Sequence, residues 1–263
     1  MTTRRAARSK PAKSTGAWKL WVAAVADMRT QWKRYLAILA VVTVPLNLFN
    51  LFPGLATDST FNLATQIAAV IMNVALIWAI VEFERTGVTP GIGAAYYDGS
   101  VAIVRFLMSA LLLVLMLVPA AFAATLYIIG FLAVSDAGTI AEQLILASIC
   151  LLIAAVSGWW MVRFGLAPTI AVAEGARPLA ALRRSRRLTL GRFWRVFSRY
   201  AALVFFIAVT AVPIALVTAG LSYLKLGPIP TIFFGLATTF TALPLLNLYL
   251  LKLYRSLEST IKA

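Results

Sequence analysis

Six stretches of the chain contain no charged residue, and each is long enough to cross a lipid bilayer as a helix. The shortest has 20 residues and the longest 30: Tyr35–Thr57, Ser59–Val81, Phe106–Ser135, Gln143–Val162, Tyr200–Leu224 and Leu226–Leu251. A membrane-spanning helix needs about 20 apolar residues, whereas helices of soluble proteins average about 11–12 residues and keep a polar face. The sequence therefore predicts an all-α, polytopic membrane helix bundle with six transmembrane helices.

Composition excludes the other classes of protein. Apolar residues make up 62% of the 263 residues and charged residues 13%, against about 45–50% and about 25% in soluble domains. A soluble fold of this size cannot bury so much apolar surface, and a disordered chain is far more polar. The single cysteine, Cys150, excludes a disulfide scaffold and is expected to pack inside a span.

The chain before the first span is basic and contains arginine and serine. We expect residues 1–16 to form a disordered cytoplasmic tail and residues 17–263 to form a single six-span membrane domain. The first uncharged run begins at residue 35, which is too late, and continues too long, for a cleavable signal peptide. A transit peptide is the alternative interpretation, because residues 2–25 carry basic residues and serine ahead of any acid.

Basic residues are distributed unequally between the two sides of the predicted spans. Nine precede the first span, nine lie between residues 163 and 199, and only Lys225 of the 24 falls on the other side. Cytoplasmic loops retain Lys and Arg, so both termini are predicted to be cytoplasmic and the protein to lie in the plasma membrane. These charges border spans, so we expect anionic lipid headgroups and not nucleic acid as the partner.

A Val-Pro pair recurs late in each odd-numbered span, and an aromatic residue lies thirteen positions before each proline. The pairs are Val44-Pro45, Val118-Pro119 and Val212-Pro213, and the aromatic residues are Trp32, Phe106 and Tyr200. We interpret this as three hairpin repeats, each preceded by an interfacial stretch: Gly16–Gln31, Pro90–Val104 and Pro178–Arg195. Coincidence is the alternative, since Val and Pro are common in membrane helices.

Two interfacial stretches have amphipathic patterns. In Ala17–Arg34, apolar residues recur at steps of three and four: Trp18, Trp21, Val22, Val25, Met28 and Trp32. That spacing predicts a helix on the membrane surface with its tryptophans in the headgroup layer. In Pro178–Phe197, Pro178 suits a first helical turn, and Gly191 is expected to break the segment before span five.

The second of these stretches contains five arginines within ten consecutive residues: Arg183, Arg184, Arg186, Arg187 and Arg192. Each basic residue near a membrane contributes about 1 kcal/mol of attraction to anionic lipid, and arginine can hold phosphate through two parallel hydrogen bonds. The cluster is predicted to bind anionic headgroups. The alternative is that these arginines only determine topology on a solvated face.

Amides within the spans are candidates for helix contacts or for a solute path: Asn47, Asn50, Gln66, Asn73 and Asn247. Asn and Gln in lipid are expected to face other helices and to form hydrogen bonds there. Arg163 is ambiguous, because span four ends either near it, leaving it at the interface, or near Glu174, leaving it buried and in need of a partner. Its aromatic neighbours favour the interface.

Residue types needed for several kinds of catalysis are missing. The chain has no histidine, which excludes Ser-His-Asp and Cys-His arrangements and histidine-bearing zinc motifs. It also contains no GxxxxGK[ST] run for a nucleotide phosphate. We therefore expect a protein that is not an enzyme and that needs no metal or other cofactor.

The segment Glu174–Phe197 carries a pattern that resembles a bacterial family. Its parts are Glu174-Gly175-x-x-Pro178, Ala181-Leu182-Arg183-Arg184-Ser185 and Leu188-Thr189-x-Gly191-Arg192-Phe193-Trp194. The pattern resembles the six-pass membrane domain attached to some glycerophosphoryl diester phosphodiesterases, and it is similar to YciC-like inner-membrane proteins. The resemblance implies a bacterial plasma-membrane protein without the phosphodiesterase reaction, because the soluble catalytic domain is not in this chain.

We expect a non-catalytic membrane scaffold or envelope factor that engages anionic lipids, a partner protein or a second copy of itself. The alternative is a transporter or permease component for a lipid or a small apolar solute. Interrupted helices around a polar cavity at mid-membrane would favour transport.

Overall fold

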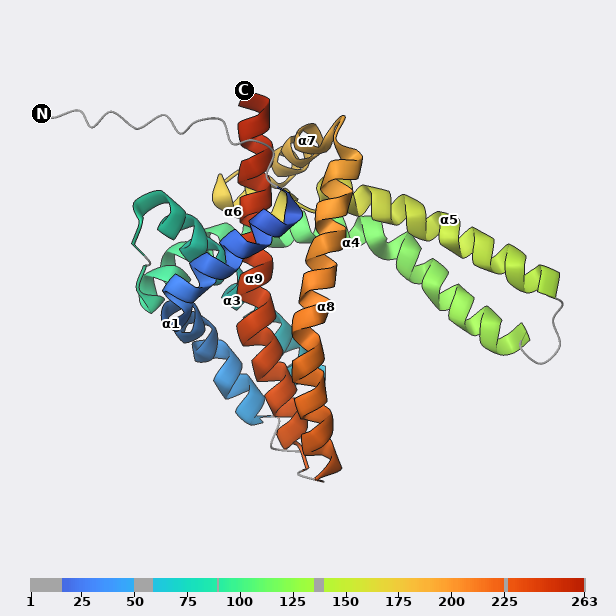
Figure 1. Ribbon diagram of the computed structural model, residues 1–263, viewed down its shortest axis with the longest axis horizontal. Coiled ribbons are helices and arrows are strands. Elements are labelled where there is room, and N and C mark those ends of the chain that lie inside the picture. The colour runs from blue at the N-terminus through green and yellow to red at the C-terminus, as the bar shows by residue number, and fades with distance from the viewer. Residues whose placement is uncertain (1–15, 50–58, 89, 135–139, 225–226, 263) are drawn as a thin grey trace, which may run out of the picture. The chain divides into compact units, whose positions relative to one another are not determined.

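The computed structural model describes residues 16–49, 59–88, 90–134, 140–224 and 227–262, and across these ranges it contains helices and no strand. Figure 1 shows them in chain order. The helices are α1 Ala17–Phe49, α3 Ser59–Thr86, α4 Ile92–Val134, α5 Ile140–Phe164, α6 Ala167–Ala173, α7 Pro178–Thr189, α8 Phe193–Tyr223 and α9 Ile229–Lys262. The all-α prediction is confirmed. Asn50 and the predicted basic tail, apart from Gly16, lie outside the described residues.

Six helical segments are long and apolar enough to cross a membrane, and they match the six uncharged runs in order. They are Ala17–Phe49, Phe61–Thr86, Ile92–Pro119, Ala147–Ala173, Phe193–Tyr223 and Ile229–Ile261. Many of their large apolar side chains are exposed, for example Leu111, Leu115 and Phe205. A soluble monomer rarely exposes so much contiguous apolar surface. The prediction of six spans is confirmed by length and composition.

The described chain forms two compact units. The first combines the residues up to Ile103 with those from Phe197 onward, and the second runs from Val104 to Val196. The single domain predicted for residues 17–263 stays a prediction.

In the first unit, α1, α3 and α9 pack against one another. Their fully buried side chains include Tyr35 and Ile38 from α1, Leu76 from α3 and Tyr249 from α9. The start of α4 joins this core, because the Tyr96 hydroxyl donates a hydrogen bond to the Ile38 carbonyl at 2.7 Å. Small residues let these helices approach closely, as is common where membrane helices meet.

The predicted interfacial stretch and span one form a single helix, α1, whose two halves run in different directions (Figure 1). Its tryptophans have different environments. Trp21 is only 8% exposed and stacks on Phe206 of α8 at 4.8 Å between ring centroids, whereas Trp18 and Trp32 are 64% and 48% exposed. Trp21 therefore packs against α8 and α9 while the other two stay exposed, and the position of these tryptophans in the headgroup layer stays a prediction.

In the second unit, α7 packs against α5 and α6. The helix α7 begins at Pro178, and the chain breaks at Gly191, whose φ of 72° lies in the left-handed region. Both features agree with the sequence predictions for this stretch. A glycine accepts this conformation without the steric cost of a side chain. Of the three predicted interfacial stretches, this one alone forms a separate helix. The first stretch forms the beginning of α1 and the second the beginning of α4, and both helices continue into a span.

Each Val-Pro proline lies inside a helix, with Pro45 in α1, Pro119 in α4 and Pro213 in α8. The similar segments after the even spans also have similar local structure. Gly87 follows α3 and Gly175 follows α6, with φ of 76° and 62°. These local likenesses agree with a repeat, while the superposition of three hairpins stays a prediction.

Candidate functional site

Helix α7 has one packed face and one exposed face. Ala181, Leu182, Ser185 and Leu188 are buried, which accounts for how α7 is held against its neighbours. Opposite them, three arginines are exposed at positions that share one helical face: Arg183, Arg186 and Arg187. Residues three and four apart on a helix are neighbours, so this face concentrates three guanidinium groups.

An exposed leucine extends the arginine face toward the start of α7. Leu179 lies one turn before Arg183 and is 61% exposed. Leu190 and Trp194 follow the helix, with 59% and 75% exposure. Apolar side chains beside basic ones suit the boundary between headgroups and acyl chains.

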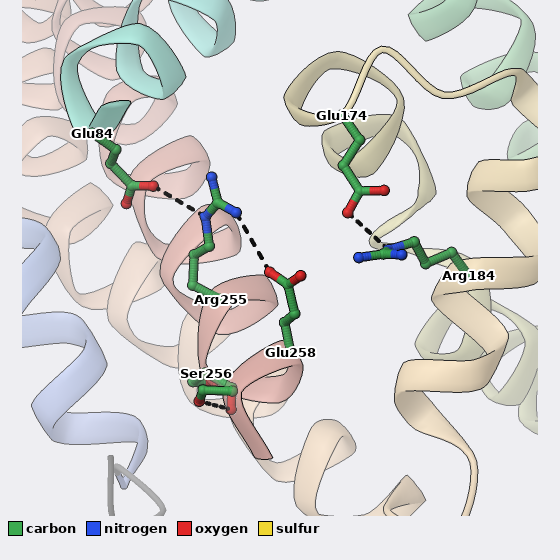
Figure 2. A network of polar contacts seen from close by, with 7 residues as sticks. Glu84, Glu174, Arg184, Arg255, Ser256 and Glu258 are labelled. Carbon is green, nitrogen blue, oxygen red and sulfur yellow. Dashed lines mark hydrogen bonds and ion pairs between the residues drawn. The ribbon is translucent and has the colours of Figure 1, made fainter. Parts of the chain in front are cut away.

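The other two arginines of the predicted cluster do not belong to this face. Arg184 turns toward Glu174, with 2.7 Å between its Nε and the Glu174 Oε1 (Figure 2). Arg192 lies beyond α7 in the turn that leads to α8, and one of its guanidinium nitrogens is buried. The structure therefore brings together three of the five predicted headgroup-binding residues.

Acidic residues are scarce along this part of the chain. Between Glu174 and Glu258 the sequence contains no Asp or Glu, and Glu174 is paired with Arg184. The positive charge of the arginine face is thus not balanced from within its own helix. Such a surface attracts anions, most strongly at low ionic strength.

Arg163 lies in the last turn of α5, which ends at Phe164. Its guanidinium carbon lies 4.1 Å from the centre of the Trp159 ring, a cation–π arrangement. Its carbonyl accepts a hydrogen bond from the Ser185 hydroxyl at 2.7 Å. Arg163 is half-buried, and the apolar segment that is long enough to span runs on to Ala173, so the end of span four near Arg163 stays a prediction. The following helix, α6, is packed within the unit and not spread along a surface.

The structure pairs two of the predicted intramembrane amides. Asn247 of α9 donates a hydrogen bond from its Nδ2 to the Asn73 Oδ1 of α3 at 2.7 Å. Asn47 donates to the Thr43 carbonyl within α1 at 2.8 Å, and Gln66 is exposed on α3. The Asn73–Asn247 pair joins two helices, as expected for amides that stabilise helix contacts.

Ion pairs connect α9 to two other helices of the first unit, and sequence reasoning did not predict them. The Lys252 Nζ lies 2.5 Å from the Asp27 Oδ2 of α1. Arg255 lies between Glu84 of α3 and Glu258 of its own helix, with both distances 3.4 Å (Figure 2). The available signal is that Glu84, Lys252 and Arg255 lie within four residues of the end of an uncharged run, whereas Asp27 lies eight residues before one.

Arg199 is a second residue whose role was missed. It is 5% exposed, donates to the Ser256 Oγ at 3.1 Å, and accepts a hydrogen bond at its carbonyl from the Tyr249 hydroxyl at 3.0 Å. These contacts join α8 to α9. From sequence, Arg199 is only the charge that precedes the fifth uncharged run. Within the described ranges, no three His, Cys, Asp or Glu side chains gather in a way that could hold a metal ion.

Comparison with known proteins gives no relative, because no family model, curated protein or solved structure matches this chain. The class of protein therefore follows from the helices themselves. Their length and apolar character define a multi-pass integral membrane protein. The resemblance of Glu174–Phe197 to a bacterial membrane family stays a prediction.

Proposed function

We propose that this protein is a non-catalytic bacterial plasma-membrane factor that engages anionic lipids through the arginine face of α7. The observation that carries the proposal is the exposure of Arg183, Arg186 and Arg187 on one face, with no acid in the same helix. The bacterial plasma membrane is proposed from the resemblance of Glu174–Phe197 and from the unequal distribution of basic residues.

The expected strength of this interaction follows from the number of charges. A basic residue near an anionic surface contributes about 1 kcal/mol, so three together raise the affinity about a hundredfold. That is enough to concentrate anionic lipid around the protein. A scaffold of this kind would gather anionic lipid, or a partner that carries it, beside α7.

The proposal requires α7 to face the cytoplasm, which accessibility labelling can check. In a Cys150→Ala background, Leu190→Cys, beside α7, and Ser222→Cys, near the end of α8, place thiols at exposed positions. We expect an impermeant maleimide added outside intact cells to label residue 222 and not residue 190. Labelling of residue 190 alone would reverse the topology and remove α7 from the cytoplasmic leaflet.

Replacing the three arginines of the exposed face of α7 tests lipid binding directly. We expect the triple variant Arg183→Gln, Arg186→Gln, Arg187→Gln to co-purify several-fold less anionic phospholipid than the wild type, because each neutralised charge removes about 1 kcal/mol. The matching lysine variant keeps the charge but loses the paired hydrogen bonds of the guanidinium. Lipid extracted with each protein in mild detergent would be quantified by mass spectrometry.

A control variant separates a defined surface from total charge. Lys19, Arg29 and Lys33 are exposed on α1, and changing these three to glutamine removes the same charge. These residues also border a span, so we expect the control to lose some anionic lipid through the same loss of charge, and the α7 variant to lose clearly more if its arginine face is a defined surface. Equal lipid loading in the wild type and the glutamine variant of α7 would mean that its arginines only determine topology.

A further inference from the structure

Arg105 lies beside α7 in the folded second unit, although 70 positions separate it from the turn it contacts. It sits on α4 where the third uncharged run begins. A Cβ added to Gly175 would lie 3.0 Å from the Arg105 Nη1. The guanidinium therefore lies directly against the turn between α6 and α7, in the space that a side chain at residue 175 would occupy.

The charges around this turn do not balance. Glu174 is the neighbouring carboxylate, and Arg184 already neutralises it at 2.7 Å. Arg105 is half-buried, and no hydrogen bond or ion pair to its guanidinium is found in the described part of the chain. A guanidinium has five N–H donors, and those of this half-buried side chain can be donated to a ligand that approaches from outside the protein. This positive group is therefore ready to accept an anion.

We infer that Arg105, held against the Gly175 turn, binds one phosphate group. The inference rests on the proposed function and deepens it, because the exposed face of α7 attracts anionic lipid in general whereas this position selects a phosphate. Arginine suits the role, since its planar donors match two phosphate oxygens. Arg184 is a positioning residue here, because its pairing with Glu174 keeps a free carboxylate away from the phosphate.

The place of Arg105 along its helix indicates where the phosphate comes from. It is the last charged residue before an uncharged run of 30 residues, so it is expected at headgroup depth on the cytoplasmic side. A glycerophospholipid carries its phosphate at that depth. Free phosphate has the same chemistry, and the experiment below separates the two sources.

A substitution at Gly175 provides a second test of the proposed phosphate site. A side chain at this position would compete with the Arg105 guanidinium for the same space, and the φ of 62° would also strain it. Gly175→Ala would place a methyl group against the guanidinium and displace it. The charge of the site would not change, so a loss of binding in this variant would report geometry and not electrostatics.

The test is native mass spectrometry of the full-length protein in detergent with added phosphatidylglycerol. We expect the wild type to retain one phosphatidylglycerol at least about tenfold more strongly than Arg105→Gln, and Arg105→Lys and Gly175→Ala to be weakened as well. Arg85→Gln removes an exposed arginine at the end of α3 and should leave the retained lipid in place. Thermal unfolding of each variant identifies any that fail to fold. If Arg105→Gln does not fold, Arg105→Lys, which keeps the charge, serves as the test in its place.

The remaining arms separate the two proposals and the two sources of phosphate. The α7 triple glutamine variant should carry fewer lipids in total yet keep the one retained phosphatidylglycerol. If Arg105→Gln retains it as strongly as the wild type while the α7 variant loses lipid, the inference is overturned and the proposed function stands. If inorganic phosphate at millimolar concentration displaces the retained lipid from the wild type and from Arg85→Gln, the site is a phosphate site whose ligand is soluble.

Discussion

Replacing Gly99 with leucine is expected to lower the free energy of unfolding by about 3 kcal/mol, because overpacking a tight helix contact forces the helices apart. Gly99 of α4 is buried against α3. A Cβ at this position would lie 3.2 Å from the Ala75 Cα and 3.6 Å from the Trp78 Cβ. The nearest of these atoms is backbone, which cannot move without shifting α3. A whole leucine side chain therefore has no space between the two helices.

Gly93→Leu is the matched control for this prediction. Gly93 lies on the same helix, six residues earlier, and nothing is found within 4 Å of the Cβ that would be added there. We expect it to change stability by less than about 0.5 kcal/mol, as is usual for exposed surface substitutions. Unfolding in mixed micelles with increasing dodecyl sulfate, followed by circular dichroism, measures both. Equal stability of the two variants would contradict the packing of α4 on α3.

Replacing Trp21 with alanine is expected to cost about 3 kcal/mol, at the lower end of the range for a buried tryptophan. Trp21 is 8% exposed, stacks on Phe206 at 4.8 Å with an interplanar angle of 24°, and lies 6.4 Å from the ring of Tyr249. Its loss removes one of the contacts that join α1 to α8 and one of those that join α1 to α9. The same unfolding titration reports the effect, and Trp21→Phe should recover part of the lost stability.

Trp32→Ala is the control for Trp21, because it removes the same side chain from the same helix at an exposed position. Trp32 is 48% exposed, so we expect a loss below about 1 kcal/mol in micelles. The same loss in the two variants would show that Trp21, like Trp32, is an interfacial residue and not part of the packed core. Sequence alone gives no reason to separate them, since both belong to one apolar pattern.

Local features of the chain could be predicted because their physical causes are local. The absence of charge over 20 or more residues marks a segment that lipid can accept, and six such segments appear as helices. Pro178 and Gly191 mark the start of α7 and the break after it for the same reason, since each restricts or frees its own backbone. The sequence predicted that amides within the spans bond to other helices, but it could not predict that Asn73 pairs with Asn247.

In the candidate site, too, the sequence shows which residues are present and the structure shows which of them meet. Its five arginines are visible in the sequence, but only the structure shows that Arg183, Arg186 and Arg187 share one exposed face while Arg184, also exposed, is paired with Glu174. Arg184 leaves that face because Glu174 lies within reach across the turn. Arg105 enters the site although no motif near it indicates this, because α4 passes the Gly175 turn only in the folded unit.

By itself, the sequence determined that this is a multi-pass helical membrane protein with basic segments at the ends of its spans, because the transfer of side chains into lipid depends on composition over short distances. Only the tertiary structure decided which apolar residues pack and which stay exposed, as with Trp21 and Trp32. It alone also decided which charges meet, as with Asp27 and Lys252, which lie 225 positions apart in the chain. Lipid accepts any apolar face equally well, so hydrophobicity does not choose the neighbours of a membrane helix, and close packing and polar pairing do.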